Sequence, residues 1–229
     1  MADDKFYRLL DMQERQITPA EYDFVRDCLS YEDPLVRIGA VPLIVDSPHC
    51  TEDDIGRLMD MCGDSDADVR AEVYEALSKV NSAKAADKLQ QMILSEKDDT
   101  ARGWAIAMWA DSVTSHTRQG GEYGRQTAFV LKTMKRRENK YSDFCSLSCM
   151  YALYRFGYPY ALDKMLRYLY NEDYQIRCAA VNDLRYAARQ SDIPKIIKAL
   201  EERAGTEEYE SVRSAAYAAI RELGGTAEH

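Results

Sequence analysis

Few residues in this chain have the types and spacing that metal chemistry requires. There are three histidines, His49, His116 and His229, and six cysteines. Cys145 and Cys149 are four residues apart, so a helix would place both thiols on one face. Two thiols without further ligands do not complete a tetrahedral zinc site. Because no Cys-x-x-Cys occurs, reduced cysteines that act as small hydrophobic residues explain the set better than disulfides. We expect no metal site and no cofactor.

Trp104, Trp109 and Asp111 are the candidates for chemistry on a nucleobase. They resemble the aromatic-plus-carboxylate site of alkylpurine DNA glycosylases built from HEAT-like repeats, with Lys132 to Lys140 as a phosphate contact. In that family the aromatic residue and the acid lie about one helical turn apart, whereas Trp109 and Asp111 are two apart and point in different directions. The chain, with a pI of about 5.0, also lacks overall the basic surface charge on which nucleic-acid binding largely depends. The glycosylase therefore stays an alternative function, and nucleic acid is not the expected partner.

No other catalytic motif is present. The chain has no Gly-x-Ser-x-Gly and no phosphate-binding glycine loop, and Gly120-Gly121 indicates a turn. We expect that the protein is not an enzyme.

A repeated phrase predicts the elements that position these residues. It consists of an acid, two variable residues, an aliphatic residue and an arginine, and its clearest copy opens the stretch Asp66 to Leu77. The residues three, four and seven positions after the arginine are apolar or aromatic in every copy, which places them on one face of a helix. A period in the thirties predicts stacked helical repeats that share a continuous core. The other copies are Asp33–Arg37, Asp98–Arg102 and Asp173–Arg177, with Tyr209–Arg213 lacking the acid and Asp143–Leu147 degenerate.

The phrase resembles the second helix of a HEAT repeat, particularly the short bacterial variety named after phycobilisome lyases. The resemblance covers roughly residues 18 to 223. It implies an all-α, right-handed α-α superhelix, a HEAT/armadillo-like solenoid of about six helix pairs. It also implies that the acid and the arginine bond along the stack and that the second helices line a concave face.

We predict a single HEAT-like repeat domain over residues 1–229, with an N-terminal cap at 1–17. The helix pairs are expected at 18–46, 51–80, 83–112, 122–157, 159–189 and 192–223. The widest departure from the repeat, at 113–140, carries Lys132, Lys135, Arg136, Arg137 and Lys140. Such insertions often map to a binding face, but cations also favour helix C-termini, and both interpretations stay open.

Charge and hydropathy narrow the partner class. Residues 1–115 hold 24 acids and 12 bases, and the remainder hold 15 acids and 18 bases. An acidic half attracts basic proteins, although solubility alone would explain it as well. No apolar run approaches the length of a membrane span, and the N-terminus is acidic and polar. We expect a cytoplasmic protein without a membrane partner.

The candidate partner-binding residues lie two, five and nine positions after an arginine, where a helix points away from the core. Trp104 is the expected anchor, because an outward tryptophan among carboxylates is typical of interfaces. Trp109 occupies the apolar seventh position and is expected in the core. Tyrosines, which are enriched at protein contacts, add to the surface. The predicted partner-binding set is Glu72, Glu75, Lys79, Trp104, Asp111, Asn182 and Tyr186.

The sequence therefore predicts a non-catalytic module that binds another protein, expected to be basic, on the concave face of a HEAT-like solenoid. A specific version is an immunity protein that neutralises a basic bacterial toxin such as a nuclease. The alternatives are the DNA glycosylase and a bilin-lyase-type subunit.

Overall fold

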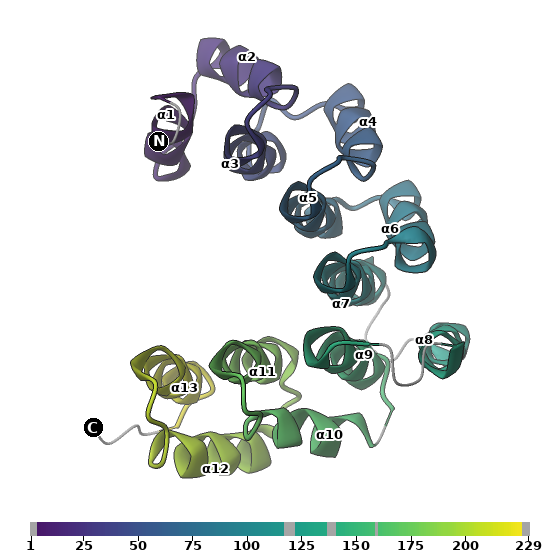
Figure 1. The fold of residues 1–229 in the computed structure, drawn as a ribbon, viewed down its shortest axis with the longest axis vertical. Coiled ribbons are helices and arrows are strands. Elements are labelled where there is room, and N and C mark those ends of the chain that lie inside the picture. Colours follow the sequence, from purple (N-terminus) through teal and green to yellow (C-terminus); the bar gives the residue numbers. More distant parts are fainter. Residues whose placement is uncertain (1–3, 117–121, 137–140, 159, 226–229) are drawn as a thin grey trace. The chain divides into compact units, whose positions relative to one another are not determined.

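The computed structural model describes residues 4–116, 122–136, 141–158 and 160–225, and this part of the chain is all-α (Figure 1). It contains thirteen helices and no strand, so the predicted fold class is confirmed. The helices are α1 (Asp4–Gln13), α2 (Pro19–Cys28), α3 (Pro34–Val45), α4 (Glu52–Met61), α5 (Ala67–Lys79), α6 (Ala83–Ser95), α7 (Asp99–His116), α8 (Gly124–Arg136), α9 (Asp143–Arg155), α10 (Ala161–Tyr168), α11 (Tyr174–Ala187), α12 (Ile193–Ala204) and α13 (Glu210–Glu222).

Local capping bonds determine where many of these helices begin. Thr18 and Glu21 form a reciprocal capping box at α2, and Thr51 forms the same arrangement with Asp54 at α4. In the four copies that keep both the acid and the arginine, the acid caps the second helix of its pair. Asp66, for example, accepts hydrogen bonds from two backbone amides of the first turn of α5, at 2.9 and 3.1 Å.

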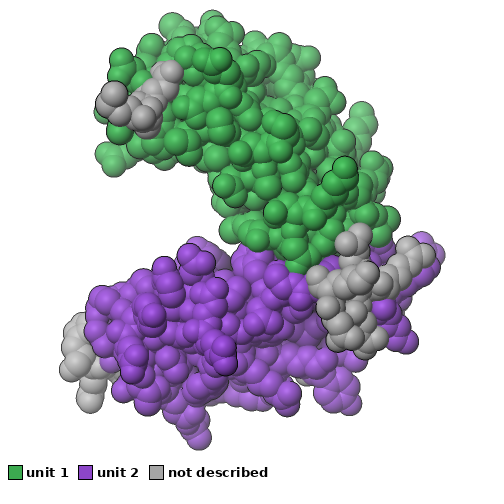
Figure 2. All heavy atoms as spheres, in the orientation of Figure 1, with its two compact units in different colours: residues 1–120 green, residues 121–229 purple. Residues whose placement is uncertain are grey.

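The chain divides into two compact units, residues 1–120 and 121–229 (Figure 2). In unit 1, helices α3, α5 and α7 pack in a row, α2, α4 and α6 form a second row, and α1 packs against α3 (Figure 1). In unit 2, α9, α11 and α13 form a row in the same way. The expected helix pairs correspond to α2/α3 through α12/α13, although α7 runs to His116, beyond its expected end at 112. The single domain over 1–229 stays a prediction.

The core follows the three, four and seven pattern. In α5, for example, Val73, Tyr74 and Leu77 are fully buried. Trp109 is 2% exposed, so its predicted place in the core is confirmed. Tyr217 is the exception, because it is only half-buried. All six cysteines are free thiols, and four of them are buried.

The predicted insertion contributes α8, which packs against α9 in unit 2. Lys132 and Lys135 are exposed on this helix. Arg137 and Lys140 lie outside the described residues, as does the side chain of Arg136. A binding role for the insertion stays a prediction. No helix in the described part of the chain is long and apolar enough to cross a membrane.

Candidate protein-binding surface

The repeated arginines connect neighbouring repeats through what we call the inter-repeat ion pairs: Arg37–Asp64, Arg70–Glu96 and Arg177–Glu207. Each arginine gives its carboxylate two hydrogen bonds of 2.7 to 2.9 Å. The same guanidinium groups also donate to two carbonyls in the loop before their own helix. The same geometry occurs at all three arginines, as is expected of a structural element of the repeats.

The expectation that the phrase's own acid bonds to the arginine needs correction. That acid caps its own helix. Arg102 and Arg213 pair with an acid in the first turn of their own helix. Arg37, Arg70 and Arg177 instead bind the residue two positions before the next copy's first residue. Sequence reasoning missed this residue, but its signal is present: Asp64, Glu96 and Glu207 each stand six positions before a repeated arginine. The carboxylate at this position also makes a local contact, because it accepts a hydrogen bond from the backbone amide two residues later, at 2.9 to 3.0 Å.

The degenerate copy shows what happens when the arginine is lost. Leu147 stands in its place and is fully buried. At the matching position of the next loop the acid is also gone, and Asn171 replaces it. The Asn171 amide donates instead to the carboxylate of Asp143, at 2.6 Å. Arginine and acid are therefore absent together, which avoids an unpaired charge at this contact.

The predicted partner-binding residues fall in both units. Unit 1 brings five of them together on the adjacent helices α5 and α7, which also contact each other through Ser78 and Met108 at 3.5 Å. On this surface Lys79 is exposed, and the other four, Glu72, Glu75, Trp104 and Asp111, are half-buried. Trp104 is thus less open than its position predicted.

The other two residues, Asn182 and Tyr186, lie on α11 of unit 2. Asn182 is half-buried, whereas Tyr186 is 68% exposed and lies beside Arg185, whose guanidinium carbon is 4.4 Å from the ring centroid. These two residues therefore belong to a different compact unit from the other five. Among the described residues, no three of His, Cys, Asp and Glu cluster as metal ligands do.

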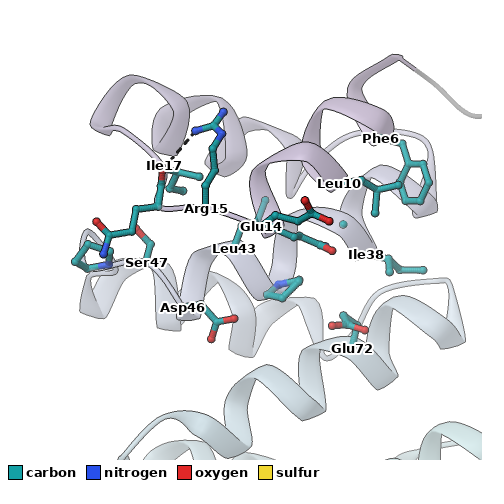
Figure 3. Close-up of a pocket in the computed structure, with 15 residues that line it drawn as sticks. Phe6, Leu10, Glu14, Arg15, Ile17, Ile38, Leu43, Asp46, Ser47 and Glu72 are labelled. Carbon is teal, nitrogen blue, oxygen red and sulfur yellow. Dashed lines mark hydrogen bonds between the residues drawn. The ribbon is translucent and has the colours of Figure 1, made fainter.

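Unit 1 also holds a groove of about 760 Å³ between α1 and α3, here called the α1–α3 groove (Figure 3). Its lining includes Gly39, Pro42 and Asp46, which stand two, five and nine positions after Arg37. These are the same outward positions that gave the predicted set in later repeats, yet sequence reasoning did not extend them to the first repeat. Glu72 of α5 completes the lining and joins the groove to the predicted residues.

The α1–α3 groove is acidic. The carboxylates of Glu14, Asp46 and Glu72 surround it, with Phe6, Leu10 and Ile38 together on one side (Figure 3). Its one cation, Arg15, is held by Glu21 at 2.7 and 3.1 Å. The three carboxylates therefore give the groove a net negative charge, because its one cation is already paired with Glu21.

Glu72 is a half-buried carboxylate of this groove. Among the described residues none gives it a hydrogen bond or an ion pair, and the nearby Lys79 pairs with Glu75 at 3.4 Å. Burial raises the pKa of Glu72 and the negative charge of Glu75 raises it further, which together outweigh the opposing effect of the positive charge of Lys79. The ionised side chain consequently destabilises the free protein at neutral pH.

We expect Glu72→Gln to raise the melting temperature at pH 7. The pKa of Glu72 is raised on folding, so its ionisation costs stability once the pH exceeds that pKa. Below the ordinary value of 4.5 the carboxyl is protonated in both states, and the gain should disappear. Thermal melts followed by circular dichroism at pH 7 and pH 4 would show this, with the exposed Glu52→Gln as control. A lower melting temperature at pH 7 would mean that Glu72 has a stabilising partner.

Comparison with known proteins agrees with this geometry. Residues 22–109 match the family model of HEAT repeats. The crystal structure of YibA from Escherichia coli has a similar fold, with a TM-score of 0.55 and 14% identity over 96% of this chain and 75% of that chain. A search of curated proteins finds no match. The predicted HEAT-like solenoid fold is thereby confirmed.

Proposed function

Because this chain is a HEAT-like repeat protein, we propose that it is a non-catalytic module that binds another protein of basic character. HEAT repeats commonly mediate protein interactions. The binding surface of the proposal comprises the α1–α3 groove and its neighbours Glu72, Glu75, Trp104 and Asp111 in unit 1. A fold alone does not determine function, so the proposal depends on the chemistry of that surface.

The observation that carries the proposal is the unpaired, half-buried carboxylate of Glu72 at the edge of an acidic groove. A buried charge without a partner costs stability. Departures of this kind from a self-consistent fold are expected at functional sites. A lysine or arginine of a bound protein would provide a paired charge for Glu72, and the half-buried Trp104 on the adjacent helix α7 would supply aromatic contact area.

The specific form of the proposal is an immunity protein that neutralises a basic bacterial toxin such as a nuclease. A strongly acidic surface would attract such a toxin and speed its capture. The protein would then act in the cytoplasm, where free cysteines persist. Supporting this form, the excess of acids lies in the half of the chain that contains the groove.

The double variant Trp104→Ala with Glu72→Lys should weaken partner binding by about 100-fold, because it removes the aromatic anchor and reverses the charge. The partner would first be captured from the native host and identified, and its dissociation constant would then be measured by calorimetry. The matched control, Leu94→Ala with Glu52→Lys, makes the same kinds of change at exposed positions on α6 and α4 and should bind as the wild type does. Circular dichroism should show equal helicity in all three proteins.

If binding persists in the double variant, the surface on unit 1 is the wrong one. Submicromolar affinity for duplex DNA at physiological salt would instead favour the glycosylase. That alternative has lost one of its three candidate residues, since Trp109 lies in the core and offers no exposed ring for a nucleobase.

A further inference from the structure

We propose that the α1–α3 groove binds a lysine or arginine side chain of the partner together with a neighbouring aliphatic side chain. This inference rests on the proposed function and specifies how the partner is recognised.

The apolar part of the groove suits the carbon stem of a long cationic side chain. Phe6 and Leu10 of α1 line it together with Ile38 and Pro42 of α3, and Leu10 is 40% exposed. Gly39 faces α1 here, because a Cβ built on it would lie 3.5 Å from atoms of Leu9 and Phe6, an ordinary van der Waals distance. Lysine and arginine bury their stems on such surfaces and keep their charged ends hydrated or paired.

The polar part of the groove offers acceptors of hydrogen bonds. Besides the carboxylates of Glu14, Asp46 and Glu72, it includes the backbone around Pro42, which lies inside α3. Proline has no amide hydrogen, so the carbonyl of Ile38, four residues earlier, lacks its usual helical donor. Charged acceptors and a carbonyl without its helical donor match a side chain that carries only donors, as lysine and arginine do.

No cation of the groove itself is available to fill this role. The guanidinium of Arg15 donates hydrogen bonds to the carboxylate of Glu21, at 2.7 Å, and to the carbonyl of Gln16, at 3.4 Å. Lys79 is paired with Glu75 on its own helix. Lys79 acts on Glu72 only through its charge, so a cation of a bound protein would give this carboxylate an ion pair that it lacks among the described residues.

Charge complementarity favours a basic protein segment over the other possible occupants. A nucleotide or nucleic acid would bring phosphates to three carboxylates, which repel them. A second copy of this chain carries a net charge of −9 and would be repelled overall as well. A segment with a cation beside an aliphatic residue satisfies both halves of the groove.

The test uses Leu10→Lys, which fills the groove with a charge of its own and removes an apolar contact. Leu94→Lys is the matched control, because Leu94 is a 54% exposed leucine on α6, away from the groove. The probe is an acetylated peptide of sequence glycine–leucine–lysine–leucine–glycine, titrated into the labelled full chain by ¹H–¹⁵N NMR. We expect saturable shifts in residues 38–46 for the wild type and Leu94→Lys, and binding about tenfold weaker in Leu10→Lys and in Glu72→Gln.

Three results would overturn the inference. The first is equal binding of the peptide by Leu10→Lys and the wild type. The second is equal binding of a peptide with glutamate in place of lysine, and the third is a shift pattern centred outside the groove. The protein partner separates this inference from the proposed function. If the captured partner binds Leu10→Lys as tightly as the wild type but fails to bind the Trp104 and Glu72 double variant, only the groove assignment is wrong.

Discussion

Glu207→Ala is expected to lower the free energy of unfolding of unit 2 by about 4 kcal/mol. The Glu207 carboxylate is fully buried and receives two hydrogen bonds from Arg177, both at 2.8 Å, and two from Arg203, at 2.8 and 2.6 Å. It also accepts the backbone amide of Tyr209 at 3.0 Å. Alanine would leave two guanidinium groups without a counter-charge, one of them buried, and removing one partner of a buried pair is more damaging than replacing both.

The matched control is Glu202→Ala on the preceding helix. Glu202 pairs with Lys198 at 3.9 Å, and both side chains are more than half exposed. Such surface pairs contribute little, so we expect a change within about 0.5 kcal/mol. Urea unfolding followed by circular dichroism would measure both variants. Equal, small effects would show that the inter-repeat ion pair does not hold the repeats of unit 2 together.

Acid is expected to unfold the protein steeply between pH 4.5 and about 2. Burial alone would raise the pKa of Glu96, but hydrogen bonds from Arg70 and Tyr74 outweigh it and lower the value to about 2. For Glu207, hydrogen bonds from Arg177 dominate and give a pKa of about 2 as well. Both values are depressed, so the stability that these groups contribute is present above 4.5 and is lost as the pH falls through the folded value, at roughly 2 kcal/mol for each group.

The contribution of one site can be isolated with Glu96→Gln. This variant should be less stable than the wild type at pH 7, and its stability should fall less steeply with acid, because one of the groups with a lowered pKa is gone. Denaturant titrations at pH 7, 5, 4, 3 and 2 would give the two slopes. Parallel slopes would mean that Glu96 does not titrate as the pair with Arg70 requires.

The repeated phrase predicted the fold because the features that define its helices are local in sequence. Asp66 can cap a helix without help from distant residues, and Val73, Tyr74 and Leu77 face one direction by helical geometry alone. The positions that point outward follow from the same geometry. This is why the sequence alone could suggest Glu72 and Glu75 as residues outside the core, where both are half-buried.

Contacts between different repeats were harder to predict. The partner of Arg37 is Asp64, 27 residues away, and the phrase itself contains another acid that could have taken that role. The α1–α3 groove was missed for a similar reason. It depends on how α1 packs over Gly39, and α1 contains no copy of the phrase from which that packing could be read.

The inter-repeat ion pairs also determine where a duplicated repeat could be added to the stack of unit 1. A segment from Asp64 to Ser95 begins with the acid that receives the preceding arginine and contains Arg70, which reaches the acid that follows it. Tandem duplication of this segment would leave every donor and acceptor matched. At Leu147 and Asn171 neither charge is present. A duplicated segment from the first unit inserted there would therefore bring an acid and an arginine without partners in the neighbouring repeats. Gene duplication can therefore lengthen this array in its first half far more readily than across that break.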